Sequence, residues 1–352
     1  MIPFFENFRD RVPDWLDAHG PASDIVVSTR VRLARNLKTF PFPHHASSVE
    51  LGTVFGDLAR RLARFAEFSG GWVLDMEQLE PAMRKVLQEL SLASPALVKE
   101  SQHRGLVLST GLERSVMINE KDHIRLVAFR AGFDPAAALD DALGIDVSLE
   151  NEVEPAFSED LGYLTASPAD VGTGLNVSSV IHLPGLVLAG EIDKVLNALR
   201  QLQFSVRGLS GEGSTVRGAM FRIANLVTLG KDEQEIVDDF QTHVGKIVIY
   251  ERSARDQLYA RDPLGIEDMA HRSLATVRQS RLITAQETYD HLSNIRLGTG
   301  LGILEPLQTG LLNRVLVQQQ TAHLELASGR LLTSREKSAA RAALLREVFA
   351  AE

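Results

Sequence analysis

Short runs of β-branched and aromatic residues alternate with amphipathic stretches up to about position 230 of the chain. Each run is rich in Val, Ile or Phe and is bounded by Gly, Asp, Ser or Asn, a pattern typical of strands. The expected strands are 25–33, 72–74, 105–108, 115–119, 124–129, 204–207 and 220–226, and helical spacing appears around 48–66, 81–92 and 190–202. Because the connections between the runs from 105 to 129 have hairpin length, we expect an antiparallel sheet.

The pattern changes after Gly230, where strand formers become rare. Helix-type spacing of apolar residues covers 231–260, 266–279, 284–293, 305–325 and 334–350. Asp262-Pro263-Leu264-Gly265 is a turn signal that marks a boundary. We therefore expect an α+β domain over 1–260, with an antiparallel sheet flanked by helices, followed by an all-helical domain over 261–352.

Composition narrows the class of protein. The 352 residues include 37 Lys and Arg against 46 Asp and Glu, a formal net charge of −9, which argues against binding nucleic acid through bulk electrostatics. The lack of cysteine excludes disulfides, thiolate zinc sites and a catalytic thiol, and no metal-binding motif is present. Without a signal-type N-terminus or an apolar run of ~20 residues, we expect a cytoplasmic protein that contacts no membrane.

Arg30 and Arg32 stand two positions apart in the first expected strand, so their side chains lie on one face of the sheet. Phosphate is the natural partner for two such planar donor groups. A pair of surface salt bridges is the alternative.

The segment 119–125 is rich in acids and reads Asn-Glu-Lys-Asp-His-Ile-Arg. If it is extended, Lys121, His123 and Arg125 share one face, whereas Glu120 and Asp122 point to the other. Glu120 then cannot stand in for a carboxylate at position 121 without a shift of register.

Two loops carry further candidate residues. Residues 167–176 contain two glycines whose backbone amides can cradle an anion, although such loops more often simply turn. Residues 206–214 contain Arg207 and Glu212, the pairing needed to hold a phosphate next to a cationic group. A loop salt bridge between them is the alternative.

Taken together and in this order, the segments resemble the ATP:guanidino phosphotransferases, and within them the bacterial protein-arginine kinases of the McsB type. The similarity extends over nearly the whole chain and is carried by 20–21, 24–26, 28–36, 119–125, 171–175, 182–184, 206–214, 228–231, 251–255, 296–298 and 341–347. It implies a phosphagen-kinase-like catalytic domain that transfers the γ-phosphoryl of ATP with Mg²⁺ to arginine side chains of protein substrates. The implied partners are a Clp protease system or a kinase activator, and the implied assembly is a homodimer.

The resemblance also assigns a nucleotide-binding site. Arg30, Arg32, Arg125 and Arg207 fall on four of the family's phosphate-clamp arginines, and Asn176 stands at the fifth position. Ser28, Gly208 and Gly211 belong to the same motifs, and Ser91 replaces a histidine near the nucleotide base.

The implied substrate site is altered. Glu212 matches one of two carboxylates that orient the guanidinium, whereas Lys121 replaces the other, which is normally the base, and Ser167 replaces a cysteine. In the C-terminal domain the phosphoarginine-sensing motif falls on Lys337, Ser338, Arg341 and Ala342. Arg341 and Ala342 keep the family pattern, whereas Lys337 and Ser338 depart from it.

Lys121 reverses the charge where a cationic substrate has to dock. Two unit charges about 4 Å apart interact by roughly 4 kcal/mol at an effective dielectric constant near 20, so the substitution is costly. We therefore favour a pseudokinase that keeps a phosphate or nucleotide site and acts through partners. The alternatives are an active kinase rewired around Glu212, a changed chemistry in which Lys121 binds an anionic acceptor, and an arginine cluster that binds no ligand.

Overall fold

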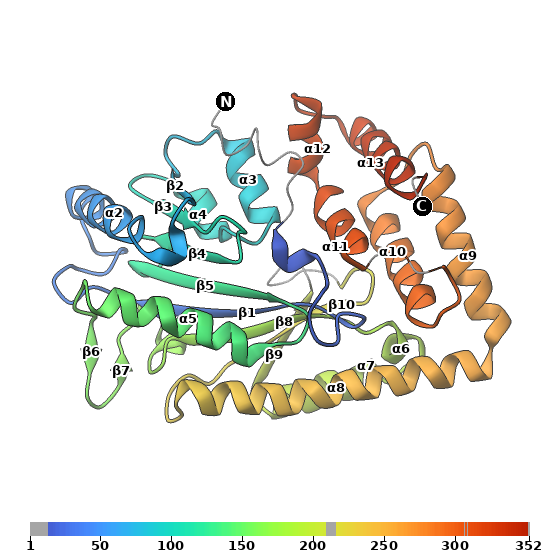
Figure 1. Ribbon diagram of the computed structural model, residues 1–352, viewed down its shortest axis with the longest axis horizontal. Helices are drawn as coiled ribbons and strands as arrows, with labels where there is room; N and C mark the ends of the chain where they lie inside the picture. The colour runs from blue at the N-terminus through green and yellow to red at the C-terminus, as the bar shows by residue number, and fades with distance from the viewer. Residues whose placement is uncertain (1–12, 209–215, 306, 308, 351–352) are drawn as a thin grey trace.

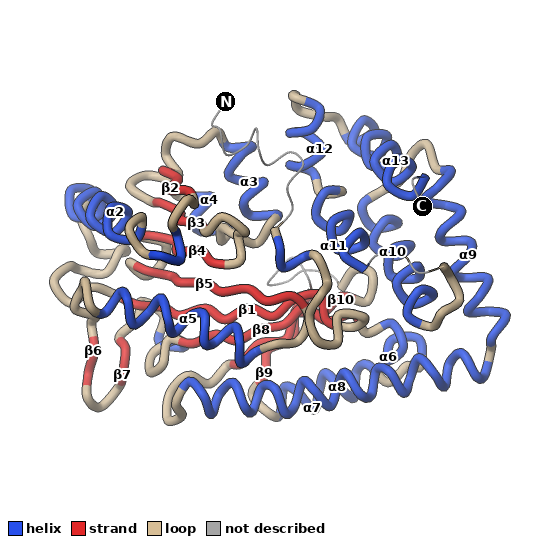
Figure 2. Tube along the Cα trace, in the orientation of Figure 1, coloured by secondary structure: helices blue, strands red, loops and turns tan. Residues whose placement is uncertain are grey.

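The computed structural model describes residues 13–208, 216–305, 307 and 309–350. Its centre is an eight-stranded antiparallel sheet (Figures 1 and 2), which confirms the expected α+β class. In spatial order the strands are β2 (Trp72–Asp75), β3 (Gly105–Leu108), β4 (Arg114–Ile118), β5 (Ile124–Ala131), β1 (Val26–Arg35), β8 (Leu175–His182), β10 (Met220–Asn225) and β9 (Phe204–Gly208). A small separate hairpin pairs β6 (Phe157–Ser158) with β7 (Gly162–Tyr163).

Five helices of the described chain cover one face of this sheet. Their bounds are α2 (Ser48–Leu62), α5 (Pro135–Glu150), α6 (Pro184–Leu188), α7 (Ile192–Gln201) and α8 (Glu233–Arg261). Apolar side chains of β1 and β5 such as Val31, Leu33 and Leu126 form a buried core with Leu139 of α5 and Phe240 of α8. Strand alternation then sends the neighbouring residues of β1 and β5 to the opposite face.

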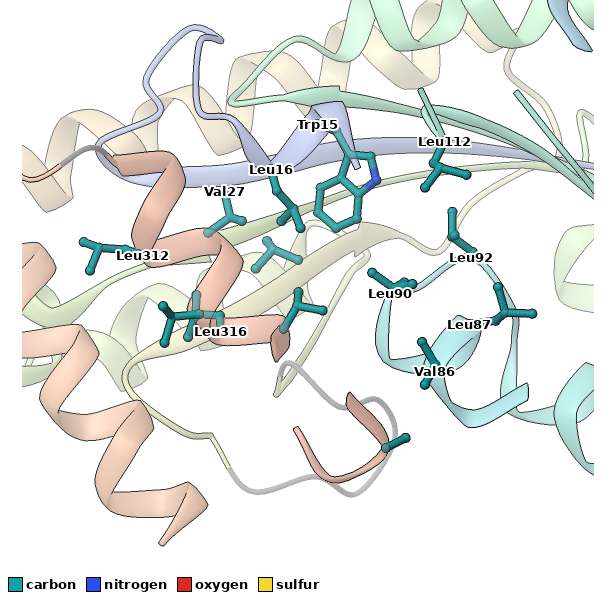
Figure 3. Close-up of a cluster of buried hydrophobic side chains, with 14 of the residues drawn as sticks. Trp15, Leu16, Val27, Val86, Leu87, Leu90, Leu92, Leu112, Leu312 and Leu316 are labelled. Carbon is teal, nitrogen blue, oxygen red and sulfur yellow. The ribbon is translucent and has the colours of Figure 1, made fainter. Parts of the chain in front are cut away.

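The opposite face is covered only in part, by a short 3₁₀ turn and by helices from both ends of the chain. Trp15 of η1 (Asp14–Leu16) stacks on Phe129 of β5 with ring centroids 4.9 Å apart. Figure 3 shows Trp15 and Leu16 in one apolar cluster with side chains of α3 (Pro81–Glu89) and of the C-terminal helices, including Leu312 and Leu316. This cluster joins the sheet to the C-terminal helices.

The C-terminal part is helical, as expected. It contains α9 (Pro263–Gln279), α10 (Ala285–Gly300), α11 (Thr309–Gln318), α12 (Thr321–Ser328) and α13 (Ser334–Ala350), packed beside the end of the long helix α8 (Figure 1). Asp262 and Pro263 begin α9, because the Asp262 side chain accepts from the Gly265 amide at 3.0 Å and proline suits the first helical position. The division after residue 260 stays a prediction. Over the described residues, no helix has both the length and the apolarity of a membrane span.

Four sequence-based expectations about elements were wrong or incomplete. Residues 119–123 form the turn between β4 and β5 instead of an extended segment, and Asn119 has φ of 56°. Strand β8, at the centre of the sheet, was not expected because Asn and Ser interrupt its apolar residues. Helix α5 was missed because its alanines and aspartates weaken the helical periodicity, and 305–325 contains two helices instead of one.

Candidate functional site

Five arginines on the strands of the described chain lie on the partly covered face of the sheet. Directly opposed residues of antiparallel strands point to the same side. The opposed pairs are Arg125 with Ala34, Arg32 with Val127 and Asn176, Arg30 with Phe129 and Ser178, Arg222 with Val180, and Arg207 with Arg222. The arginines therefore follow a diagonal from β5 across β1 to β10 and β9. Arg30 and Arg32 share a face as expected, and Arg222 is an addition that the sequence analysis missed.

The acidic turn 119–123 folds back onto one end of this diagonal. Glu120 Oε2 lies 2.8 Å from Arg125 Nη1, and Asp122 Oδ2 lies 3.3 Å from Arg125 Nε. Both carboxylates are buried. The expectation that Glu120 and Asp122 point away from Arg125 is therefore wrong, because side chains in a tight turn do not alternate as they do in a strand.

Lys121 occupies the exposed corner of the same turn. Its backbone amide donates to Glu120 Oε2 at 2.7 Å. Its ammonium group makes no ion pair with any residue that the structure describes. The lysine thus stands beside the acidic turn without neutralising it.

Asp170 is a second residue that sequence reasoning missed. It ends the 3₁₀ turn η3 (Pro168–Asp170), which begins after Ser167. Its carboxylate lies 3.0 Å from Arg32 Nη2 and 3.4 Å from Arg125 Nη2, so it bridges two of the arginines. The sequence feature that could have indicated it is its position as the one acid in the glycine-containing loop 167–176.

Arg32 and Arg30, which stand two positions apart on β1, differ in the charges that surround them. Burial and the charge of Arg125 lower the pKa of Arg32, whereas Asp170, Glu120 and Asp122 raise it. The pKa of Arg30 lies well below its usual value. Burial is the largest cause, and the charges of Arg222, Arg32 and Arg125 lower the pKa further, in that order. Among the residues that the structure describes, no carboxylate counteracts this shift, so positive charge accumulates around Arg30.

Several buried hydrogen-bond donors on this face have no acceptor among the described residues. Arg30 Nε, Arg32 Nε and Ser178 Oγ have no hydrogen-bond partner in the described part of the chain. Buried polar groups are normally paired, and unpaired guanidinium donors beside a hydroxyl suit the oxygens of a phosphate. The face therefore fits the phosphates of a nucleotide.

Asn176 lies on the same face but its amide group is already engaged. Asn176 Nδ2 lies 3.3 Å from Asn225 Oδ1 and 3.4 Å from Asn225 O. Ser28 is buried on β1, beyond Arg30 on the same face, and Gly208 ends β9 directly after the exposed Arg207. Gly211 and Glu212 lie outside the described residues.

Ser91 follows α3 with φ of 60°. It stands three positions before Ser94, whose hydroxyl donates to Glu120 Oε1 at 2.6 Å. The segment that carries Ser91 thus contacts the acidic turn. A contact of Ser91 itself with a nucleotide base stays a prediction.

The C-terminal candidates lie within the helical part. Arg341 is buried and donates from Nε to Gln319 O at 3.0 Å and from Nη1 to Ile283 O at 3.2 Å. Lys337 forms an ion pair with Glu325 at 3.0 Å. Ser338 Oγ donates to Ser334 O, and Ala342 is fully buried. Their role in sensing phosphoarginine stays a prediction.

Known proteins resemble this chain over nearly its whole length. The ATP:guanido phosphotransferase C-terminal catalytic domain matches residues 57–254, and the protein-arginine kinase McsB C-terminal domain matches residues 263–352. A protein-arginine kinase of Bacillus subtilis (strain 168) is 40% identical over 344 residues, which cover 96% of this chain and 94% of that protein. One from Geobacillus stearothermophilus is 39% identical over 348 residues, covering 98% and 96%.

Solved structures support the fold. A lombricine kinase superposes with a TM-score of 0.58 at 22% identity, over 69% of this chain and 71% of that one. The duplicated taurocyamine kinase of Schistosoma mansoni, with bound transition state analog components, gives 0.60 at 22% identity, over 67% of this chain and 34% of that one.

Proposed function

The chain belongs to the ATP:guanido phosphotransferase family, in its protein-arginine kinase branch, and we propose that it is a pseudokinase that retains the nucleotide-phosphate site. The family reaction converts ATP and protein L-arginine to ADP and protein N-phospho-arginine. In this proposal the chain binds nucleotide, transfers phosphoryl groups to arginine poorly or not at all, and acts through protein partners.

The phosphate half of the site supports nucleotide binding. Arg30, Arg32 and Ser178 present buried donors without acceptors, and Arg222 and Arg207 extend the positive face. Phosphoryl transfer depends mainly on such positioning and charge neutralisation. Among the described residues no cluster of carboxylates or histidines can hold a metal ion. Mg²⁺ would therefore be held chiefly by the phosphates and by water.

The guanidinium half of the site supports impairment, and the observation that carries the proposal lies there. Lys121 occupies the position of the family's base, and the three nearby carboxylates of Glu120, Asp122 and Asp170 already accept from Arg125 or Arg32. A guanidinium is protonated at neutral pH, so it becomes a nucleophile only when a base is positioned to take its proton. None of these three is available for that task while it remains paired.

An active kinase is the second candidate, and the exposure of Lys121 favours it. Water screens an exposed ammonium, so a repulsion of roughly 4 kcal/mol at a dielectric constant near 20 falls to about 1 kcal/mol in bulk water. In this alternative Glu212 orients and activates the arginine, and the product marks proteins for Clp proteolysis. A homodimer and a kinase activator, both implied by the family, belong to either candidate.

The experiment that separates the candidates measures binding and turnover on the same preparation. Calorimetry with ATP and ADP in the presence of Mg²⁺ is compared with acid-labile phosphate formed on an arginine-rich protein substrate. The pseudokinase binds nucleotide and forms no phosphoarginine detectable by mass spectrometry. Turnover at ordinary enzyme rates that disappears in Glu212→Gln establishes the active kinase instead.

A further inference from the structure

The arginine diagonal contains two arginines, Arg32 and Arg125, that carboxylates of the described chain neutralise, and two, Arg30 and Arg222, that no described carboxylate contacts. Asp170, Glu120 and Asp122 all lie against Arg32 or Arg125. The side chains of Arg30 and Arg222 have neither a hydrogen bond nor an ion pair to any residue within the described ranges. Both side chains are only partly accessible to water.

The two unpaired arginines are close enough to share a ligand. Arg30 faces Ser178 on β8, and Ser178 in turn faces Ala224, which stands two residues from Arg222 on β10. With strands about 4.8 Å apart and a rise of about 3.3 Å per residue, the Cα atoms of Arg30 and Arg222 are separated by roughly 12 Å. Two long side chains on one face can meet at a common anion across that distance. Consistent with this, Arg222 lowers the pKa of Arg30 more than any other charged group does, after burial itself.

A third donor lies between them. Ser178 belongs to the central strand β8, and its Oγ is buried without a hydrogen-bond partner in the part of the chain that the structure describes. The hydroxyl of the next residue, Ser179, points to the other face and lies 3.1 Å from Thr29 Oγ1. The unpaired hydroxyl is therefore the one that faces the arginines.

An uncompensated pair of half-buried cations is unfavourable for folding. Such a pair is expected where a ligand supplies the missing negative charge, because binding sites often lower the stability of the protein in exchange for affinity. Asn176 cannot supply positive charge on β8, and its amide is tied to Asn225. Arg222 places a cation on the adjacent strand instead.

We propose that Arg222, together with Arg30 and Ser178, binds one phosphate group of the nucleotide and supplies the positive charge that position 176 lacks. This inference rests on the proposed function, because it assumes that the arginine face binds a nucleotide. It adds a residue and a hydroxyl to the phosphate site, and it predicts that the polyphosphate extends toward β10 and β9.

The test titrates the full chain with Mg-ATP and with inorganic triphosphate by calorimetry, comparing wild type with Arg222→Gln. Loss of a charge-assisted contact weakens binding of both ligands about 10- to 100-fold. The matched control is Arg130→Gln, which removes the same charge from β5 on the opposite face, where Arg130 pairs with Asp141. Binding by this control stays near the wild-type value, and Arg222→Lys falls between Gln and wild type.

Thermal unfolding gives a second readout that a merely structural arginine would not produce. Without ligand, Arg222→Gln unfolds at the wild-type temperature or above it, because an unpaired cation has been removed. With triphosphate, wild type gains more stability than the variant does. Ser178→Ala loses part of the same gain.

Two results contradict the inference in distinguishable ways. Equal triphosphate affinity in Arg222→Gln and wild type, or a ligand-free variant that unfolds at a lower temperature, overturns the role of Arg222 and leaves the proposed function standing. A wild-type chain that binds neither Mg-ATP nor triphosphate overturns the proposed function and this site with it.

Discussion

The carboxylate of Asp170 lies 3.0 Å from Arg32 Nη2, so the chain supplies its own anion to a face that is otherwise suited to phosphate. The same carboxylate reaches Arg125 Nη2 at 3.4 Å. A nucleotide that binds both arginines has to displace Asp170 or share them with it. The contact therefore links the conformation of the 167–176 loop to occupancy of the site.

Asp170→Asn is expected to bind Mg-ATP more tightly than wild type, by about tenfold, because the competing charge is lost. Calorimetry measures the change. Asp141→Asn is the matched control, since Asp141 also bridges two arginines, Arg114 and Arg130, but on the opposite face. Weaker binding by Asp170→Asn would mean that Asp170 organises the site instead of competing for it.

The free energy of unfolding is expected to decrease as the pH falls, because of His123. Burial lowers the pKa of this histidine from 6.5 to about 4. The unfolded chain therefore takes up a proton that the folded chain resists. The contribution is fully present above pH 6.5 and is lost as the pH falls toward 4, at about 1.4 kcal/mol per pH unit.

Urea unfolding at several pH values measures this slope. His123→Gln reduces it in the interval from 6.5 to 4, whereas replacement of the exposed His271 by Gln leaves it unchanged. Equal slopes in wild type and His123→Gln would show that other groups carry the dependence.

Glu251 is expected to be essential for the packing of α8 against the first turn of α6. Its buried carboxylate accepts from the backbone amides of Gly185 and Leu186 at 2.8 and 3.0 Å and from Arg255 Nε at 2.6 Å. Glu251→Ala leaves the buried Arg255 without this partner and lowers the free energy of unfolding by about 3–5 kcal/mol.

Chemical denaturation measures the loss. The control is Asp256→Ala, an exposed residue of the same helix, with an expected change within about 0.5 kcal/mol. Similar losses in both variants would contradict the assignment of a special role to Glu251.

The sequence was sufficient where local periodicity determines orientation. Arg30 and Arg32 lie in a run of β-branched residues, so their common face followed from alternation alone. The opposite case is the turn 119–123, where the left-handed backbone at Asn119 ends the alternation and brings Glu120 and Asp122 onto Arg125. No local pattern showed where the strand stops.

Arg222 could not be found from local pattern for a different reason. Its position beside Arg30 depends on β8, which lies between β1 and β10 and pairs with both. Such pairing joins segments far apart in the sequence, and its register is set by the packing of the whole sheet. Asp170 was missed for the same reason, since its two arginines lie on different strands.

The most direct measurement of the central claim follows transfer of labelled γ-phosphate from Mg-ATP to protein arginine, with wild type and Lys121→Glu compared at equal nucleotide saturation. Lys194→Glu, at an exposed lysine on α7, is the control for the change in charge. We predict no phosphoarginine above background for wild type and for the control, and measurable product once the carboxylate stands at position 121. Wild-type turnover at about 1 s⁻¹ or faster, unaffected by Lys121→Glu, would contradict the account.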